Sequence, residues 1–231
     1  MIRVFCVKHG DKYSATYVNR LYNMTQRHLT LPHVFVCFTE NTSGLDSNIQ
    51  VINLPDMPLG GWWYKTYMFA PEHHEKYTVN LYFDLDSVIV NNIDRFLFYK
   101  SGKFVGLRDL AHVFRPNWYR LGSAVMRWQS GQHEHVWTDL CENFDLARRF
   151  RGDQDWIWYQ CRDCIEFFPE EWTKSYKWQI RTKSELIRVN GRLQFAATRN
   201  PAIPPETSVL AFHGTPAVDE VRDPVIVENW Q

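Results

Sequence analysis

Short hydrophobic runs alternate with amphipathic stretches along the first 83 residues of the chain. Runs of five or six mostly apolar residues predict buried strands at 2–7, 33–38, 50–54 and 78–83. Residues 14–28 place apolar side chains three and four positions apart, which predicts a helix that Ser14 or Thr16 would cap. Residues 62–69 predict another helix, which Pro71 would end. This alternation favours an α/β fold with a mainly parallel central sheet flanked by helices.

The pattern is less regular beyond residue 100. Hydrophobic runs predict strands at 104–107 and 122–128, and amphipathic stretches predict helices at 132–144 and 154–161. From Ile180 onward we expect short strands, a proline-rich loop at 200–206, and a strand over 209–212 that ends at His213-Gly214. No repeat, linker or low-complexity segment divides the sequence, so residues 1–231 are expected to form a single domain.

Composition excludes several classes of protein. The 26 Lys and Arg residues balance the 26 Asp and Glu residues, which disfavours nucleic acid or an anionic membrane as the main partner. No stretch approaches about 18 apolar residues, and the first run is too short for a signal peptide, so a cytoplasmic protein without a transmembrane anchor is expected. The five cysteines are expected to be reduced and structural, because Cys161-x-x-Cys164 has no evident second ligand pair for zinc.

Two carboxylates interrupt an apolar segment at the end of the fourth predicted strand. Asp84 and Asp86 follow Thr-Val-Asn-Leu-Tyr-Phe and precede Val-Ile-Val. Residues two apart in a strand point to the same face, where two carboxylates repel each other unless a cation lies between them. Hard oxygen ligands suit Mg²⁺ or Mn²⁺. The pair therefore indicates a metal site at the end of the strand, with a solvated turn as the alternative.

Three further segments carry candidate chemistry. His213 follows an apolar run and becomes a candidate only if it shares a site with the two carboxylates. Asp153, Gln154 and Asp155 precede an aromatic helix; the two acids could simply cap it and complement its dipole, while Gln154 could bind a polar ligand. The segment 60–65, Gly-Gly-Trp-Trp-Tyr-Lys, could be a ligand-binding element or the anchor of a helix start.

These motifs together resemble those of GT-A glycosyltransferases, and of glycosyltransferase family 8 in particular. The family's motifs appear in the expected order as Asp11-Lys12-Tyr13, Asp84-Leu85-Asp86, Asp153-Gln154-Asp155 and His213-Gly214. The resemblance implies a GT-A, Rossmann-like fold. It also implies transfer of a sugar, with retention, from a nucleotide-diphosphate sugar to a glycan or other hydroxyl acceptor. UDP-sugars are the expected donors.

The resemblance further implies roles for individual residues. Asp84, Asp86 and His213 would bind Mn²⁺ or Mg²⁺ on the diphosphate. Nucleotide contacts would come from Val7, Asp11, Tyr13 and Lys65, with Tyr13 stacking on the base. The donor sugar would face Asp109, Ser123 and Asp153, with Gln154 beside the anomeric carbon and Asp155 as a possible base or nucleophile. The chain departs from the family where Ser123 replaces an asparagine, and after His213, where the usual diphosphate-binding lysine is missing.

Two alternatives stay open. The Asp84-x-Asp86 motif also resembles that of haloacid-dehalogenase phosphatases, with Asp84 as nucleophile, although there the motif normally follows the first strand. The 10 Trp, 11 Tyr and 15 Phe residues also suit a non-catalytic module that binds carbohydrate or sugar nucleotides.

Overall fold

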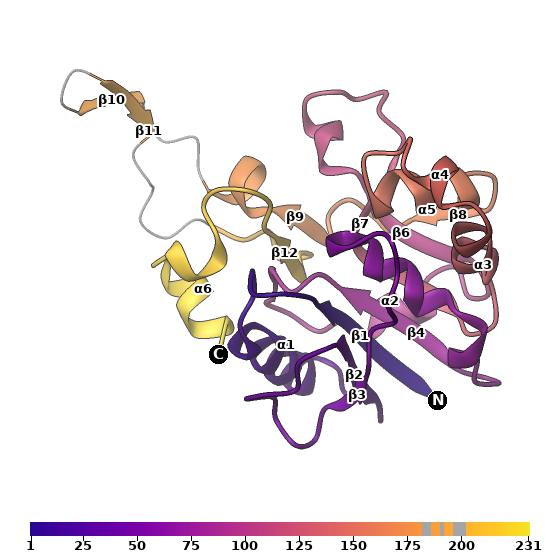
Figure 1. Cartoon of the computed structure of the whole chain (residues 1–231). Coiled ribbons are helices and arrows are strands. Elements are labelled where there is room, and N and C mark those ends of the chain that lie inside the picture. Colours follow the sequence, from indigo (N-terminus) through magenta and orange to yellow (C-terminus); the bar gives the residue numbers. More distant parts are fainter. Residues whose placement is uncertain (182–185, 190–191, 196–201) are drawn as a thin grey trace.

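The computed structural model describes residues 1–181, 186–189, 192–195 and 202–231, and its centre is a seven-stranded sheet. The strand order is β3-β2-β1-β4-β7-β6-β8, and within this sheet only β7 runs against its neighbours (Figure 1). Its strands are β1 Ile2–Lys8, β2 Val34–Thr39, β3 Gln50–Ile52, β4 Val79–Phe83, β6 Phe104–Arg108, β7 Leu121–Gln129 and β8 Ile165–Phe167. The predicted α/β class and mainly parallel sheet are confirmed.

A second, three-stranded sheet lies directly after the Asp84–Asp86 segment. It consists of β5 Ser87–Ile89, β12 Val209–Ala211 and β9 Thr173–Ser175, with β12 in the middle. A separate hairpin is formed by β10 Leu186–Val189 and β11 Arg192–Phe195. The small sheet brings the C-terminal part of the chain to the end of β4, more than a hundred residues away in sequence.

The helices flank the central sheet. The α-helices are α1 Ala15–His28, α2 Asp94–Phe98, α3 His135–Glu142, α4 Phe144–Ala147, α5 Asp153–Cys161 and α6 Pro224–Asn229. The other helical segments have 3₁₀ or, for η4, π geometry: η1 Gly61–Phe69, η2 Pro71–His73, η3 Leu110–Val113, η4 Tyr176–Ile180 and η5 Val218–Glu220. Figure 1 shows α1 and α6 together near the C-terminus, and α3, α4 and α5 grouped at the other side of the molecule.

Side-chain alternation along the strands builds one hydrophobic core on each face of the sheet. In β1, Val4 and Cys6 belong to the cluster that contains α1, whereas Phe5 packs in the cluster that contains η1, α3 and α5. Leu81 and Tyr82 of β4 divide in the same way. A period of two along a strand produces this arrangement when both faces are covered, and it explains why these strands are mostly apolar.

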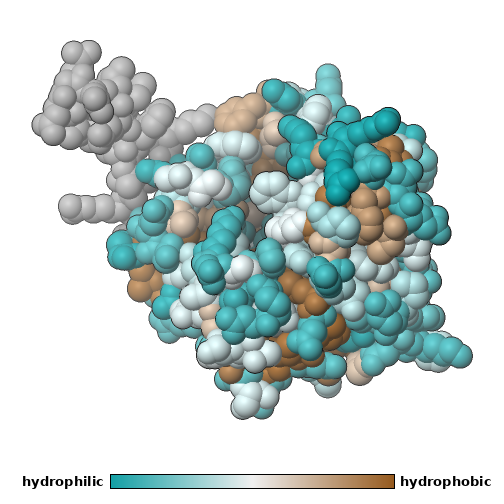
Figure 2. All heavy atoms as spheres, viewed as in Figure 1, coloured by the Kyte–Doolittle hydropathy of each residue, from teal (hydrophilic) through white to brown (hydrophobic). Residues whose placement is uncertain are grey.

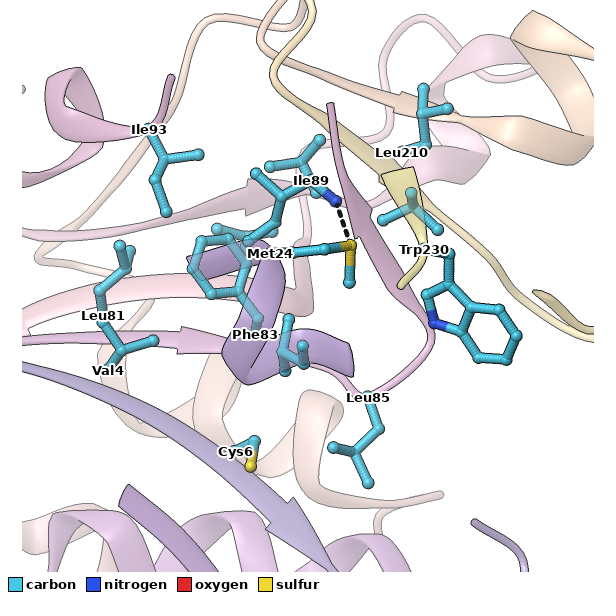
Figure 3. Close-up of a cluster of buried hydrophobic side chains, with 14 of the residues drawn as sticks. Val4, Cys6, Met24, Leu81, Phe83, Leu85, Ile89, Ile93, Leu210 and Trp230 are labelled. Atoms are coloured by element: carbon cyan, nitrogen blue, oxygen red, sulfur yellow. Dashed lines mark hydrogen bonds between the residues drawn. The ribbon is translucent and has the colours of Figure 1, made fainter. Parts of the chain in front are cut away.

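The α1-side core ties the small sheet to the rest of the fold. Met24 of α1 lies against β5, and its sulfur accepts a hydrogen bond from the Ile89 backbone N–H at 3.3 Å (Figure 3). Leu210 of β12 and Trp230 belong to the same buried cluster. The position of β12 beside β5 is therefore fixed by apolar packing as well as by strand pairing.

Several element boundaries differ from the sequence prediction. The helix expected over 132–144 is two helices, because the Asn143 side chain accepts a hydrogen bond from the Leu146 N–H and starts α4 anew. The segment 62–69 is helical but has 3₁₀ geometry. Of the loop predicted at 200–206, residues 200 and 201 lie outside the described residues. The single domain over 1–231 stays a prediction.

The cysteines form no disulfide in the described residues, and the surface drawn in Figure 2 is mainly polar. All five cysteines lie in described segments and are free thiols, with Cys6 and Cys37 buried opposite each other on β1 and β2. The face drawn in Figure 2 is mainly hydrophilic, with small separate hydrophobic patches. Among the described residues, no helix has the length and hydrophobicity needed to span a bilayer.

Candidate active site

A cleft of about 450 Å³ opens where the carboxyl ends of β1 and β4 meet. β2 pairs with one edge of β1, and β4 pairs with its other edge. The order of the strands in the sheet therefore reverses between β1 and β4. Such a reversal leaves a crevice that open α/β sheets use for ligands. The cleft is lined by Val7, His9, Lys12, Tyr13, Gly61, Trp62, Lys65, Tyr82, Asp84, Leu85, Asp86, Ser123, Asp153 and Gln154.

A second hollow of about 250 Å³ adjoins the cleft. The two share Asp84, Ser123 and Gln154, and the second hollow extends to Asp109 and His213. The structure therefore brings the predicted motifs from the middle and the C-terminal part of the chain to one region. It also places the residues expected to face a donor sugar between the two cavities.

Lys65 holds two carboxylates together at the floor of the cleft. Its ammonium lies 2.8 Å from Asp84 Oδ1 and 3.3 Å from Asp153 Oδ2, and it donates a hydrogen bond to Ser123 Oγ at 3.1 Å. These four residues come from η1, the end of β4, the start of α5 and β7. Burial alone would lower the pKa of Lys65, but Asp153 and Asp84 outweigh it and hold the pKa above its usual value.

Asp153 is the most deeply buried carboxylate of this group. Burial raises its pKa, and Lys65 and the Ser123 hydroxyl, which donates to Asp153 Oδ2 at 3.1 Å, oppose that effect. The residue begins α5, so the orphan N–H groups of the first turn also favour its charged form. Ser123, which stands where the family has asparagine, thus binds both Lys65 and Asp153.

Asp86 lies on the other side of the cleft and pairs with a neutral group. The Tyr13 hydroxyl donates to Asp86 Oδ2 at 2.8 Å. Burial, followed by repulsion from Asp84, raises the pKa of Asp86 to about 6. When Asp84, Asp86 and Asp153 are all ionised beside the single positive charge of Lys65, these four side chains carry a net charge of 1 − 3 = −2. A divalent cation would balance this charge.

Tyr82 is a cleft residue that the sequence analysis missed. Its hydroxyl donates a hydrogen bond to Asp84 Oδ1. Residues two apart on an extended strand share a face, so Tyr82 at two positions before Asp84 was recognisable as the neighbour of the carboxylate. With Lys65 and Tyr82 both bound to Asp84, the side chain is held in one orientation.

Gln154 has both ends of its amide engaged. The Ser123 N–H donates to Gln154 Oε1 at 3.2 Å, and Gln154 Nε2 donates to Asp109 Oδ2 at 3.1 Å. Asp109 also accepts a hydrogen bond from the Ala111 N–H at the start of η3. The predicted donor-sugar residues Asp109, Ser123 and Asp153 therefore belong, with Gln154, to one connected network.

His213 lies beside the carboxylates without joining them in a common cluster. The Phe212 N–H donates to the Asp86 carbonyl at 3.2 Å, which places the adjacent His213 next to that segment. Its Nε2 lies 2.7 Å from Ser175 Oγ. The ligand atoms of Asp84, Asp86 and His213 are not all within 4.8 Å of one another in the part of the chain that the structure describes. Their joint role as metal ligands stays a prediction.

Two residues expected in the site lie outside the cleft. Asp155 is separated from Asp153 by about 200° around the helix, so it faces away and forms an ion pair with Arg151 at 2.9 Å. It lines a different hollow with several arginines. Asp11 is exposed and does not line the cleft, whereas Tyr13 does. The structure thus offers no support for Asp155 as base or nucleophile, or for Asp11 as a nucleotide contact.

His9 and Lys12 line the cleft although the sequence assigned them no role, and Trp62 of the segment 60–65 lines it as well. Trp62 is 61% exposed at the rim, while its neighbour Trp63 is buried in the core. The Gly-Gly-Trp-Trp-Tyr-Lys segment therefore does both things that the sequence left open, since one tryptophan anchors the helical turn and the other borders the cleft. An exposed aromatic ring beside a cleft can stack on a planar or sugar ring.

The sheet order and the cleft at its reversal point define a Rossmann-like α/β fold of the nucleotide-binding kind. No protein-family model and no curated protein sequence matches this chain. The fold was therefore compared with solved structures.

The galactosyltransferase LgtC, in complex with donor and acceptor sugar analogues, aligns with 94% of this chain and 89% of its own, at a TM-score of 0.63 and 13% identity. An active-site glutamine-to-glutamate mutant of LgtC aligns over 99% and 94%, at a TM-score of 0.65 and 12% identity. The glycosyltransferase GlyE of Streptococcus pneumoniae TIGR4 aligns over 73% and 45%, at a TM-score of 0.54 and 12% identity. The chain has the GT-A fold of these enzymes, as the sequence resemblance implied.

Proposed function

We propose that the protein is a metal-dependent glycosyltransferase that moves a sugar from a nucleotide-diphosphate sugar, with UDP-sugars the expected donors, to a glycan or other hydroxyl acceptor. One observation carries the proposal. Asp84 and Asp153 share the ammonium of Lys65, and Asp86 lines the same cleft at the carboxyl ends of β1 and β4, in a fold shared with glycosyltransferases. Their excess negative charge suits a divalent cation rather than an anionic ligand by itself.

Asp84 and Asp86 are the residues that would hold Mn²⁺ or Mg²⁺, with His213 on the adjoining rim. Carboxylate oxygens are the donors that these ions prefer, and the three carboxylates outnumber the two lysines, Lys12 and Lys65, that line the same cleft. A bound ion would supply Lewis-acid stabilisation of the departing nucleoside diphosphate. The lysine that the family uses on the diphosphate is missing after His213, which makes this contribution more important here.

The other side chains have roles that follow from their contacts. Lys65 keeps Asp84 and Asp153 together. Its positive charge would also stabilise the negatively charged diphosphate. Asp153, fixed by Lys65 and Ser123, can accept hydrogen bonds from donor-sugar hydroxyls. Tyr13 and Trp62 provide aromatic surface at the cleft for the nucleotide.

The retention of configuration that the resemblance implies would follow from a front-face displacement. Gln154 is an amide and therefore a poor nucleophile, and both of its polar ends already form hydrogen bonds. The carboxylate of Asp155 points away from the cleft. In the proposed step the acceptor oxygen forms its bond to the anomeric carbon on the side from which the diphosphate leaves. The leaving phosphate oxygen takes the proton of the acceptor hydroxyl.

The test uses two substitutions on the same helix. The purified chain is screened with nucleotide sugars for transfer and for slow hydrolysis, with Mn²⁺ and with EDTA. Asp153→Asn should reduce turnover by roughly 100-fold, as loss of one preorganised charged group does in other enzymes. Asp155→Asn is the matched control and should retain wild-type activity, because Asp155 binds Arg151 outside the cleft.

Other outcomes would contradict the proposal. Equal activity of both variants would show that Asp153 is not part of the active site. Undiminished turnover with EDTA would show that the reaction does not need a metal. Donor binding without any turnover would favour the non-catalytic binding module. Release of phosphate from a simple aryl phosphate would instead favour the phosphatase with Asp84 as nucleophile.

A further inference from the structure

A second cluster of potential metal ligands lies at the far end of α5 from the cleft. His133, His135 and Cys161 each place a ligand atom within 4.8 Å of the other two. His133 lies in the loop after β7, His135 begins α3, and Cys161 ends α5. The helix rises about 1.5 Å per residue, so Cys161 lies roughly 12 Å along α5 from Asp153. In the segments that the structure describes, this is the one group of three His, Cys, Asp or Glu residues gathered so closely.

Cys164 provides a fourth ligand next to this group. The turn after α5 folds back, so that the Cys164 N–H donates to the Cys161 carbonyl at 2.9 Å. The Cys164 sulfur lies 3.9 Å from His133 Nδ1. The sequence analysis found no second ligand pair for zinc near Cys161-x-x-Cys164. The fold supplies the second pair, His133-x-His135, from a distant segment.

The surroundings of the histidines match those of metal ligands. His135 Nε2 lies 3.2 Å from the Gln160 carbonyl oxygen. When Nε2 carries the proton and donates it to this carbonyl, Nδ1 has a free lone pair for a metal ion. Ligating histidines usually donate their other ring N–H to a backbone carbonyl in this manner. His133 has a φ of 66°, a conformation that is uncommon for residues other than glycine.

We propose that His133, His135, Cys161 and Cys164 form a structural zinc site that fastens the C-terminal end of α5 to the start of α3. Two thiolates and two imidazoles are a common tetrahedral zinc set, and they disfavour Mg²⁺ and Ca²⁺. Zn–N bonds of about 2.1 Å and Zn–S bonds of about 2.3 Å require ligand atoms roughly 3.3–3.8 Å apart. The ligand atoms of His133, His135 and Cys161 lie within 4.8 Å of one another, and the Cys164 sulfur lies 3.9 Å from His133 Nδ1, so shifts of about 1 Å would bring these atoms to such spacings.

The site would act on the cleft only through the helix that the two share. Asp153 and Gln154 begin α5, and their hydrogen bonds to Ser123 and Asp109 depend on where that helix lies. A zinc ion at the other end would fix the helix against α3. This proposal concerns stability and does not depend on the function proposed above.

The test measures metal content first. The chain is produced without a histidine tag in zinc-supplemented medium, kept reduced, and analysed by mass spectrometry of its metals. We expect one zinc per chain in the wild type. Cys161→Ser and Cys164→Ser should weaken zinc affinity by about 100-fold or more, since loss of even an outer-shell partner costs 10–100-fold. Cys141→Ser, which changes an exposed thiol on α3 outside the cluster, is the control and should keep its zinc.

Two further measurements keep the proposal falsifiable if Cys161→Ser fails to fold. Cys164 is exposed, so Cys164→Ser should fold and report on the site independently. Replacement of zinc by Co²⁺ should give the visible bands of a tetrahedral ion and a near-ultraviolet thiolate charge-transfer band, and the charge-transfer band should be weaker in Cys164→Ser, which keeps only the Cys161 thiolate. Asp153→Asn should keep its zinc, which separates this site from the catalytic one. Equal zinc content in wild type and Cys164→Ser, or a Cys161–Cys164 disulfide in reduced protein, would overturn the proposal.

Discussion

Substitution of Asp86 by asparagine should stabilise the metal-free protein. Burial and the neighbouring Asp84 raise the pKa of Asp86 from an ordinary value of 3.8 to about 6, so the charged form costs free energy at neutral pH. Asparagine has nearly the same shape, and its carbonyl oxygen can still accept the hydrogen bond from the Tyr13 hydroxyl. The substitution therefore removes a charge and little else.

The size and pH range of the effect follow from the two pKa values. Between about pH 4 and pH 6 the unfolded chain releases a proton that the folded chain keeps, so the stability of the wild type falls as the pH rises through this window. The full cost is present above pH 6. A change from 3.8 to about 6 corresponds to about 3 kcal/mol in the free energy of unfolding. For a chain of this size, that equals roughly 6–12 °C in melting temperature.

The assay is thermal and urea unfolding of both proteins in EDTA, from pH 4 to pH 8. The stability gain of Asp86→Asn should be close to zero at pH 4 and reach its full value above pH 7. Exposed Asp11→Asn is the control and should change stability by less than about 0.5 kcal/mol. A saturating divalent cation should then stabilise the wild type, by about 2.7 kcal/mol at 100 times its Kd, and the variant far less.

Two results would refute this reasoning at different points. A gain that does not change between pH 4 and pH 8 would mean that charge repulsion at Asp86 does not destabilise the cleft. A pH-dependent gain would support the cost of the Asp86 charge. If Mn²⁺ then stabilised Asp86→Asn as much as the wild type, Asp86 would not be a metal ligand.

Two other predictions concern the walls of the cleft. Lys65→Met should destabilise the protein by about 3–5 kcal/mol, because it leaves Asp84 and Asp153 partly buried without their cation. Urea unfolding measures this loss of stability, and Lys65→Arg should lose less. An equally stable Lys65→Met would show that the carboxylates do not need this partner. Gly152→Ala would place a methyl group 2.6 Å from Trp62 Nε1, so the exposed Trp62 side chain must move. Calorimetry should then show weaker donor binding, while the melting temperature stays nearly constant. A large fall in melting temperature with intact binding would place the role of Gly152 in folding instead.

The sequence predicts the central sheet well because its strands are buried on both faces. The runs that became β1, β2 and β4 contain almost no polar residue, and this pattern follows from burial alone. The same reasoning locates Asp84 and Asp86, since a charged residue directly after such a run must lie at the end of a strand. These parts of the prediction depend on neighbouring residues only.

Features that depend on distant residues could not be predicted in this way. Nothing near Lys65 in sequence reveals that it contacts Asp84 and Asp153, because η1, β4 and α5 meet only in the folded chain. The proposed zinc ligands His133 and Cys161 are likewise far apart in the sequence, with α3 and α4 between them. The orientation of Asp155 was predictable in principle, since helical periodicity alone turns it away from Asp153.

The pairing of β12 with β5 has a consequence for how the protein is made. Leu210 lies opposite Val88, so the strand that supports the rim of the cleft is synthesised more than a hundred residues after its partner. A nascent chain that still lacks residues 209–213 must leave the edge of β5 unpaired, and edges of this kind invite aggregation. Closure of so long a loop is also slow compared with the local pairing of β1, β2 and the helix between them. The proposed donor binding should therefore appear late in synthesis, and a chain truncated before residue 209 should already contain most of the sheet but bind no donor.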